Sequence, residues 1–419
     1  MVTFCISRLA HFGREIFEPL KGTINDLKIR VSYGKLPNQL FNPANPSNSS
    51  IYPYIALLPT GMSGHIFGSQ QNIYAGAPGL VSPDFTWEDV ITKDIGLDFS
   101  LFKSRLTGSF DWYIRETKNM LVGGQPLPGV LGTSAPLRNA ANLKTKGWEL
   151  SLNWRDKIGQ DFDYSVRLGL SDYVSTITKY DLNPTKSLGS YYVGQKFGEI
   201  WGFVTEGYFA TDAEGANYDQ SQLSNNTQMA GDIKYADLNK DGKITYGDNT
   251  VSNPGDRKVI GNSTPRYQYG INLTARYKSF DLAVFFQGVG KRDFLPGDNA
   301  FFGFYSEWSV PFAYMKDHWT PQNPNAYFPR LRFGGGSNFE TQTKYLQSAA
   351  YCRLKNLSIG YTLPTDIINC IRVKSLRVYA TGQNLFEITK LFDAYDPEII
   401  GFGTYPLSRA ISFGVQLGL

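Results

Sequence analysis

Apolar and polar residues alternate along much of this chain. In the segment RLTGSFDWYIR at residues 105–115, Leu106 and Phe110 fall on one side and Asp111 falls on the other, because successive side chains of a β-strand point to opposite faces. The same alternation recurs at residues 148–154, 164–170, 271–277, 280–288 and 411–419, and further candidates lie at 27–33, 94–102, 351–363 and 375–386. The pattern predicts about ten β-strands and an all-β fold.

A soluble β-sandwich and a membrane-spanning β-barrel both produce such alternation, and three features favour the barrel. Several runs last about nine to eleven residues, the length that a tilted strand needs to cross a bilayer. The apolar faces of the first six runs carry no charge, as expected where an Arg or Lys at the bilayer midplane costs roughly 2–4 kcal/mol. Aromatic residues stand at the ends of these faces, where barrel girdles are found: Trp148, Trp154, Tyr164, Tyr277 and Phe280.

Three long polar segments, at residues 34–90, 178–262 and 290–345, separate the predicted strands. Loops of this length are uncommon in compact domains and are usually functional where they are ordered. Outer-membrane barrels have short turns on one side of the membrane and long loops on the other. The uneven spacing therefore favours an antiparallel transmembrane β-barrel with long extracellular loops.

The composition agrees with a strand-rich fold, since 15% of the residues are aromatic, 42 are glycine and 19% are charged. The net charge is +4 without any block of like charge, which argues against nucleic-acid binding. Cys5, Cys352 and Cys370 are odd in number and lack metal-ligand spacing, so we expect isolated thiols. No stretch reaches the roughly 18 apolar residues of a transmembrane helix, and the start of the chain lacks the features of a signal peptide.

One polar segment, DLNKDGKITYGD at residues 237–248, has the spacing of a calcium-binding loop. Oxygen ligands at the matching positions of such a loop converge on one hard cation, and a glycine permits the sharp turn. The predicted ligands are Asp237, Asn239, Asp241, Lys243 through its backbone carbonyl, and Asp248 in place of the usual Glu. The alternative is a turn closed by Asp and Asn side chains that needs no metal. Neither flank shows helical periodicity, so we expect an ion here to order a loop and not to operate a sensor.

The sequence contains no organised catalytic motif. None of the HExxH, GxSxG, CxxC, P-loop or GxGxxG patterns occurs, and the chain has three histidines. His318 adjoins Asp317, but neighbouring side chains in an extended segment point apart, so the pair is a weak acid–base candidate. Scattered acids leave a paired-carboxylate glycosidase site open from the sequence alone. We do not predict an enzyme.

Seven segments, taken in order, resemble the C-terminal half of the SusC/RagA-like TonB-linked (TonB-dependent) outer-membrane transporters. Any one of them is a weak signal, but seven in the family's order are specific. The segments are LKIRVSYGKLPNQ (27–39), DIGLDFSLFKSRLTGSFDWYIRETKNML (94–121), NLKTKGWELSLNWR (142–155), GDIKYADLNKDGKIT (231–245), VIGNSTPRYQYGINL (259–273), DHWTPQNPNAYFPRL (317–331) and NLFEITKLFDAYDPEI (384–399).

The resemblance implies nutrient import across the outer membrane, with an oligosaccharide or a peptide as the substrate. It also implies two partners, a SusD-like surface lipoprotein that covers the barrel and the TonB system that supplies energy. Because the family carries a calcium-type loop, the resemblance supports structural calcium as the one cofactor, with Asp237, Asn239, Asp241 and Asp248 as its ligands. It assigns no substrate-contact residue.

The resemblance covers residues 14–419 as a single barrel portion and leaves residues 1–13 unmatched. Barrels of this kind have about 22 strands around a plugged lumen, so we expect the ten or so predicted strands to form about half of such a barrel. Because no signal peptide, TonB box or plug is recognised, we expect the chain to be truncated. The competing hypothesis is a soluble calcium-dependent β-sheet protein that binds carbohydrate through exposed Tyr and Trp. A third hypothesis, an outer-membrane barrel enzyme, is disfavoured by the missing nucleophile.

Overall fold

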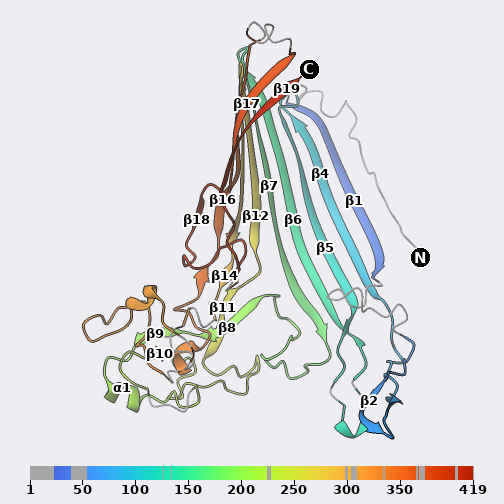
Figure 1. The fold of residues 1–419 in the computed structure, drawn as a ribbon, viewed down its shortest axis with the longest axis vertical. Helices are drawn as coiled ribbons and strands as arrows, with labels where there is room; N and C mark the ends of the chain where they lie inside the picture. Colours follow the sequence, from blue (N-terminus) through green and yellow to red (C-terminus); the bar gives the residue numbers. More distant parts are fainter. Residues whose placement is uncertain are drawn as a thin grey trace.

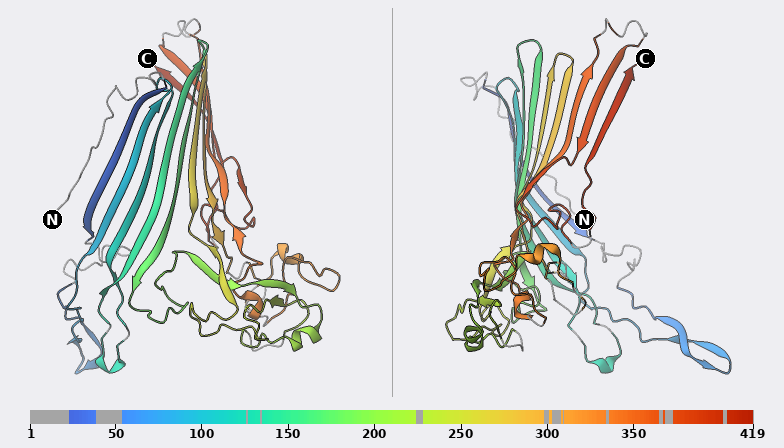
Figure 2. Two further views of the ribbon diagram at one scale, coloured as in Figure 1. Left: turned by 180° about the vertical axis from the view of Figure 1, so that it is seen from behind. Right: turned by 60° about the vertical axis from the view of Figure 1, so that its left-hand side comes forward.

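A computed structural model describes residues 23–38, 54–125, 127–133, 135–223, 228–297, 301–302, 308, 310–333, 336–364, 367, 373–401 and 404–418. The unmatched segment 1–13 and the cysteines Cys5 and Cys370 lie outside the described residues. Within the described part, a tall sheet rises from a broad cluster of loops at one end (Figure 1). Two further views show the same sheet from behind and from an oblique angle, with the loop cluster again at one end (Figure 2). No helix in this part of the chain is long and apolar enough to cross a membrane.

The tall sheet has eleven antiparallel strands in the described part of the chain, in the order β1-β4-β5-β6-β7-β12-β13-β16-β17-β19, with β18 also paired to β16. Each of the ten segments predicted from the alternation overlaps one of these strands, which confirms the all-β antiparallel fold. The strands are β1 (Ile24–Asn38), β4 (Glu88–Leu101), β5 (Leu106–Val122), β6 (Arg138–Ile158), β7 (Phe162–Tyr180), β12 (Arg266–Tyr277), β13 (Phe280–Lys291), β16 (Tyr351–Thr362), β17 (Ser375–Gln383), β18 (Glu387–Thr389) and β19 (Ala410–Gly418).

Several strands are longer than the alternation indicated. β6 has 21 residues and β7 has 19, because pairing continues past the apolar run toward the loops. On β6, for example, Lys144 and Lys146 precede the apolar positions that begin at Trp148. The sequence pattern therefore marked the apolar span of each strand and not the whole strand.

The register places the predicted apolar residues on one face of the sheet, which we call the apolar face. Phe110 of β5 lies opposite Leu97 of β4 and Leu150 of β6, and Leu150 lies opposite Leu170 of β7. No second layer covers this face among the described residues; Phe413, for instance, is 83% exposed. A soluble sandwich would bury these side chains, so the soluble alternative is not supported. The exposure of this face supports the prediction that it faces lipid.

Aromatic residues border the apolar face at both ends, as predicted. At the end with short turns, Phe162, Tyr277, Phe280 and Tyr361 are aligned across four neighbouring strands. Trp154 donates its indole N–H to Tyr164 Oη over 3.2 Å at the same end. At the end with long loops, a row that we call the loop-side tryptophan row crosses β1, β4, β5 and β6 through Val31, Ile95, Trp112 and Trp148.

The long polar segments fold together instead of forming separate loops. They contain short antiparallel pairs, β8 (Glu199–Phe203) with β11 (Arg257–Asn262), β9 (Thr205–Tyr208) with β10 (Ile233–Tyr235), and β14 (Asp293–Phe294) with β15 (Gln347–Ser348), together with the helix α1 (Asp212–Asn217). A separate hairpin joins β2 (Thr60–Phe67) to β3 (Gln70–Ala75). The sequence pattern predicts loops here but no shared core.

A hydrophobic core holds this loop region together. Its buried members, drawn from segments far apart in the sequence, are Phe203, Leu223, Ile233, Tyr235, Ile244, Phe301, Phe302, Met315, Phe328, Tyr345, Ala349, Leu391 and Tyr395. Buried polar side chains are paired within it: Tyr235 donates to the Ser337 carbonyl over 2.6 Å, and Gln220 accepts from the Tyr235 N–H over 2.8 Å. Because buried polar groups that lack a partner are costly, these bonds fix the way the loops pack.

Gly288 on β13 occupies a position where only hydrogen fits. A Cβ there would overlap the main-chain carbonyl oxygen of Tyr351 and the ring of Tyr269. The carbonyl belongs to the paired strand β16 and cannot move without breaking the ladder. Gly169 on β7 is a matched contrast, since a Cβ there has no neighbour within 4 Å.

We predict that Gly288→Ala lowers the free energy of unfolding by about 1–3 kcal/mol, the usual range for overpacking. Gly169→Ala should leave stability unchanged within about 0.5 kcal/mol or raise it slightly. The measurement is equilibrium unfolding of the protein reconstituted in lipid bilayers. Equal effects of the two substitutions would contradict the packing described for Gly288.

Candidate functional site

The face opposite the apolar face is polar and contains a hollow of about 470 Å³. Six neighbouring strands, β5, β6, β7, β12, β13 and β16, contribute to it. Its polar and glycine lining consists of Ser109, Asp111, Glu149, Ser151, Gly169, Ser171, Gln268, Gly270, Gln287, Gly288 and Tyr351. Hydroxyl and carboxamide groups both donate and accept hydrogen bonds, so this surface suits a ligand rich in hydroxyl or amide groups.

An arginine orders the wall beside this hollow by reaching across a glycine. Arg30 of β1, Gly96 of β4 and Asp111 of β5 are in register, and Arg30 Nη2 lies 2.8 Å from Asp111 Oδ1. Arg30 Nε also binds Asp98 Oδ2 over 2.9 Å. A Cβ at position 96 would overlap the Arg30 and Asp111 side chains, so the glycine makes their contact possible. Through this contact Arg30 holds Asp111 at the hollow.

The same arrangement recurs further around the sheet. Arg377 of β17 binds Asp281 of β13 with a 2.6 Å contact between Nη2 and Oδ2, passing over Gly360 of the intervening strand β16. These two bridges are not evident from the sequence. The one trace of each bridge in the sequence is a glycine at a polar position of an alternating run. Such a glycine becomes informative only when the strand register is known.

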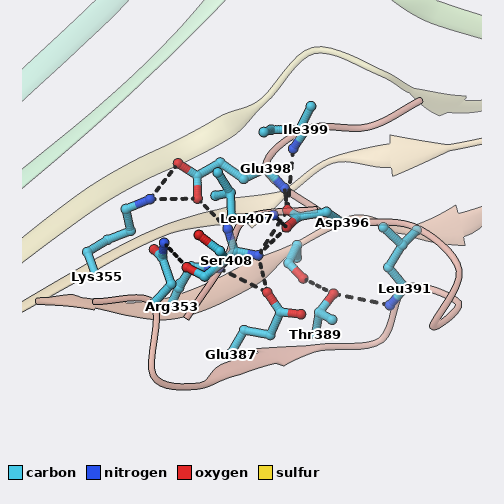
Figure 3. A network of polar contacts seen from close by, with 12 residues as sticks. Arg353, Lys355, Glu387, Thr389, Leu391, Asp396, Glu398, Ile399, Leu407 and Ser408 are labelled. Carbon is cyan, nitrogen blue, oxygen red and sulfur yellow. Dashed lines mark hydrogen bonds and ion pairs between the residues drawn. The ribbon is translucent and has the colours of Figure 1, made fainter. Parts of the chain in front are cut away.

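A buried arginine anchors the segment after β17 to the wall (Figure 3). Arg353 of β16 is 3% exposed. It binds Glu387, both carboxylate oxygens of Asp396 over 2.9 Å, and Glu398 Oε2 over 2.7 Å. Lys355 Nζ adds a 3.0 Å contact to Glu398 Oε1. Since a buried charge is tolerated only when it is paired, the three carboxylates and Arg353 depend on one another.

The protonation of Asp396 reflects this environment. Burial acts to raise the pKa of Asp396, but hydrogen bonds from the backbone N–H groups of Glu398 and Leu407 and from Arg353 outweigh burial. The pKa of Asp396 therefore lies below its usual value. A lowered carboxylate pKa means that the anchor contributes stability at neutral pH and loses it as the pH falls through that lowered pKa.

A second hollow, of about 560 Å³, lies in the loop region. Tyr208, Trp319, Lys344 and two prolines are among the residues that line it. Lys344 Nζ lies 4.5 Å from the centre of the Tyr208 ring, and burial lowers the pKa of Lys344. Aromatic rings beside a cation form a surface on which sugar rings or peptide side chains can stack.

The structure brings three of the predicted ion ligands together on one turn. Asp237 accepts hydrogen bonds from the N–H groups of Lys240 and Gly242, and the Asn239 side chain donates to Asp241 over 2.9 Å. Lys243 donates its own N–H to Asp241. Two carboxylates and one carboxamide are oxygen donors that a calcium ion accepts, so the donor chemistry fits in part.

The predicted fifth ligand, Asp248, is engaged elsewhere. Its carboxylate accepts a 2.9 Å hydrogen bond from the Asn253 side chain. Across the described residues, no group of three or more His, Cys, Asp or Glu side chains is arranged to hold a metal ion. Calcium binding by the loop therefore stays a prediction.

Asp256 closes the loop and was missed by the sequence analysis. Its carboxylate is fully buried and accepts from the N–H groups of Leu238 over 2.9 Å and Thr245 over 2.8 Å. These two residues flank the acidic turn, so one side chain ties both ends of it. Asp256 lies outside the twelve-residue motif, which is why spacing did not reveal it.

The other candidates from the sequence lie apart from these sites. His318 Nδ1 contacts the Met315 carbonyl over 3.0 Å, whereas Asp317 binds Asn323 and the Tyr327 N–H. The two side chains thus have separate partners, as expected for extended neighbours. Cys352 is an unpaired thiol.

Comparison with known proteins places the chain in a family. The family described as "TonB dependent receptor-like, beta-barrel" matches residues 23–385. TonB-dependent receptor P3 of Formosa agariphila is 29% identical over 97% of this chain, and TonB-dependent receptor P26 of the same organism is 28% identical over 97%. TonB-dependent receptor SusC of Bacteroides thetaiotaomicron is 23% identical over 94%.

A solved structure gives the same fold. The structure of the RagAB peptide transporter matches 96% of this chain with a TM-score of 0.71 and 22% identity. The chain spans 41% of the length of the first two curated relatives and 42% of the matched RagAB chain. The names of this family and of these relatives are those of receptors and transporters, in agreement with the expectation that the chain is no enzyme.

Proposed function

Because this chain belongs to the TonB-dependent receptor-like β-barrel family, a family of the outer membrane, we propose that it forms part of the wall of a nutrient importer. The proposed substrate is an oligosaccharide or a peptide. The observation that carries the proposal is the polar hollow that crosses six strands on the face opposite the apolar face. A wall with hydrocarbon on one side and hydrogen-bonding groups on the other is the arrangement of a transport lumen.

The hollow supports both substrate classes. Ser109 and Ser151 offer hydroxyl groups opposite each other on β5 and β6, and Ser171 of β7 offers a third from its position opposite Glu149. Gln268 and Gln287 offer carboxamides from β12 and β13. These groups pair equally well with sugar hydroxyls and with peptide amides. The RagAB structure is named for a peptide transporter, whereas the name of SusC gives no substrate, so we keep both classes in the proposal.

The loop region supports the proposed partners. We propose that a SusD-like surface lipoprotein covers the loop end and that the TonB system drives transport in the outer membrane. The loop region has its own hydrophobic core and exposes Trp308, Val310 and Phe312. A folded loop region that exposes large apolar side chains suits a protein partner, because the cores of protein interfaces are enriched in aromatic residues.

To test the importer proposal, Ser151→Trp is introduced to fill the hollow. We expect uptake of labelled oligosaccharides or peptides by cells to fall about tenfold or more, because the indole fills the space of the substrate, and steric overlap of this kind costs about 1–3 kcal/mol, where 1.4 kcal/mol is a factor of ten. Ser165→Trp is the matched control. Ser165 of β7 lies on the same polar face of the sheet as Ser151, but it lies outside the hollow, where it bonds Thr274. Equal uptake by both variants and the parent, with equal amounts of folded protein, would contradict the proposal.

We propose in addition that the loop at 237–248 binds calcium and that the ion orders the loop region. The clustered oxygens of Asp237, Asn239 and Asp241 support this proposal. The buried Asp256 carboxylate instead closes the loop through backbone N–H groups, and this closure needs no ion.

The two contributions can be separated by thermal unfolding with and without a calcium chelator. We expect Asp237→Asn to abolish the stabilisation by calcium while leaving the calcium-free protein nearly unchanged. Asp256→Asn should lower stability by about 1–3 kcal/mol under both conditions, since it weakens buried hydrogen bonds to a charged group. Absence of any calcium effect on the parent protein would contradict ion binding without affecting the importer proposal.

A further inference from the structure

The apolar face continues toward the loops as a strip of lysines. Beyond the loop-side tryptophan row, the next row across β1, β4, β5 and β6 contains Tyr33, Lys93, Ile114 and Lys146. The row after it contains Lys35, Ile91, Glu116 and Lys144. Because alternate residues of a strand share a face, these side chains extend from the same surface as Trp112 and Trp148.

The height of the apolar face places these lysines at a membrane surface. On β7, ten residues separate Phe162 in the turn-side aromatic row from Asp172, which lies opposite Trp148. At about 3.3 Å per residue and a tilt of roughly 40°, this span is about 25 Å high, which matches the apolar band of a membrane barrel. The first lysine row therefore lies about 5 Å beyond the band and the second about 10 Å beyond it.

The strip carries an excess of positive charge. We define the lysine patch as Lys35, Lys93, Lys118, Lys144 and Lys146. Two carboxylates lie among them: Asp89 binds Lys35 over 3.0 Å, and Glu116 binds Lys144 over 3.1 Å and Lys118 over 3.8 Å. Five ammonium groups thus face two carboxylates.

Two members of the patch are available to a ligand. Lys93 and Lys146 are exposed, and neither forms a salt bridge with any described residue. They flank Ile114 in one row, so their strands lie roughly 10 Å apart at the usual strand spacing. Lysine side chains of this kind extend along apolar surface and keep their ammonium group at the level of lipid headgroups.

We propose that the lysine patch binds the phosphate-bearing headgroups of lipids with a net negative charge in the leaflet on the loop side of the membrane. The partner follows from charge and depth together: a surplus of ammonium groups directly above an aromatic girdle meets phosphates and not hydrocarbon. An apolar residue between the two free lysines contacts the acyl chain below the headgroup. The binding rests on the membrane placement proposed above but requires neither a substrate nor TonB.

The opposite end of the sheet provides a contrast. Lys157 pairs with Asp163 over 3.1 Å near the short turns, and Lys103 lies within one of those turns. Replacing these two lysines removes the same amount of charge without touching the patch. The pair Lys103→Gln and Lys157→Gln is therefore the matched control.

The test uses the protein purified from membranes in detergent and transferred to nanodiscs. Lipid retained by the protein is counted by native mass spectrometry in phosphatidylcholine alone and in phosphatidylcholine with one part in five of a monophosphoryl glycolipid. We expect the double variant K93Q/K146Q to retain the phosphoglycolipid roughly 25-fold more weakly than the parent, because each of the two lysines near an anionic lipid surface contributes about a factor of five. The control pair should retain it as the parent does.

Equal retention by K93Q/K146Q and the parent would overturn the proposal, and so would an equal loss in the control pair. Competition by inorganic phosphate at the same concentration would also overturn it, because the site would then bind free phosphate. Uptake measurements on the Ser151→Trp and Ser165→Trp proteins read out the importer proposal separately, so the failure of one proposal is distinguishable from the failure of the other.

Discussion

The structure depends on one constraint: hydrocarbon offers no partner to a backbone hydrogen-bonding group. A strand in a bilayer must therefore pair on both sides, and its lipid-facing side chains must be apolar. Within the wall every central strand meets this condition through continuous antiparallel pairing. The edge strands β1 and β19 are paired on one side within the described residues. The same constraint applies to these two edges, and the chain spans 41% of the length of TonB-dependent receptor P3.

The constraint also explains what could be read from the sequence. Alternation with a period of two is a local property, so all ten predicted strands were found, and residues such as Phe110 and Leu150 were assigned to the correct face. Aromatic borders were equally local. The strand ends were underestimated because pairing continues through residues such as Lys144 and Lys146, which interrupt the apolar run.

The features that the sequence did not reveal are those that depend on register or on distant segments. The hollow exists because the register places Ser109 opposite Ser151, and Ser171 opposite both Glu149 and Gln268. This alignment cannot be derived from the polarity of each strand alone. Asp256 closes a motif to which it does not belong. The core of the loop region joins residues as far apart as Phe203 and Tyr395, and no local pattern signals such packing.

Charged side chains have different structural roles in different parts of the molecule. On the polar face, Arg30 and Arg377 bridge strands over glycines, and they leave the serine and glutamine groups of the hollow available. At the loop end, Arg353 anchors the segment that contains Asp396 and Glu398. Toward the membrane surface, unpaired lysines replace these internal bridges. The wall is thus cross-linked by ion pairs on its polar face and carries surplus positive charge beside the loop-side tryptophan row.

The central claim is that the apolar face contacts hydrocarbon, and two adjacent positions on β6 test it most directly. Leu150 lies on the apolar face, in register with Phe110 and Leu170, and Ser151 lies on the polar face, in register with Ser109. The account predicts that Leu150→Arg lowers the free energy of unfolding in a bilayer by roughly 2–4 kcal/mol, while Ser151→Arg changes it by less than about 1 kcal/mol. Equal costs at the two positions would contradict the account, because they would mean that the two faces of the sheet meet the same medium.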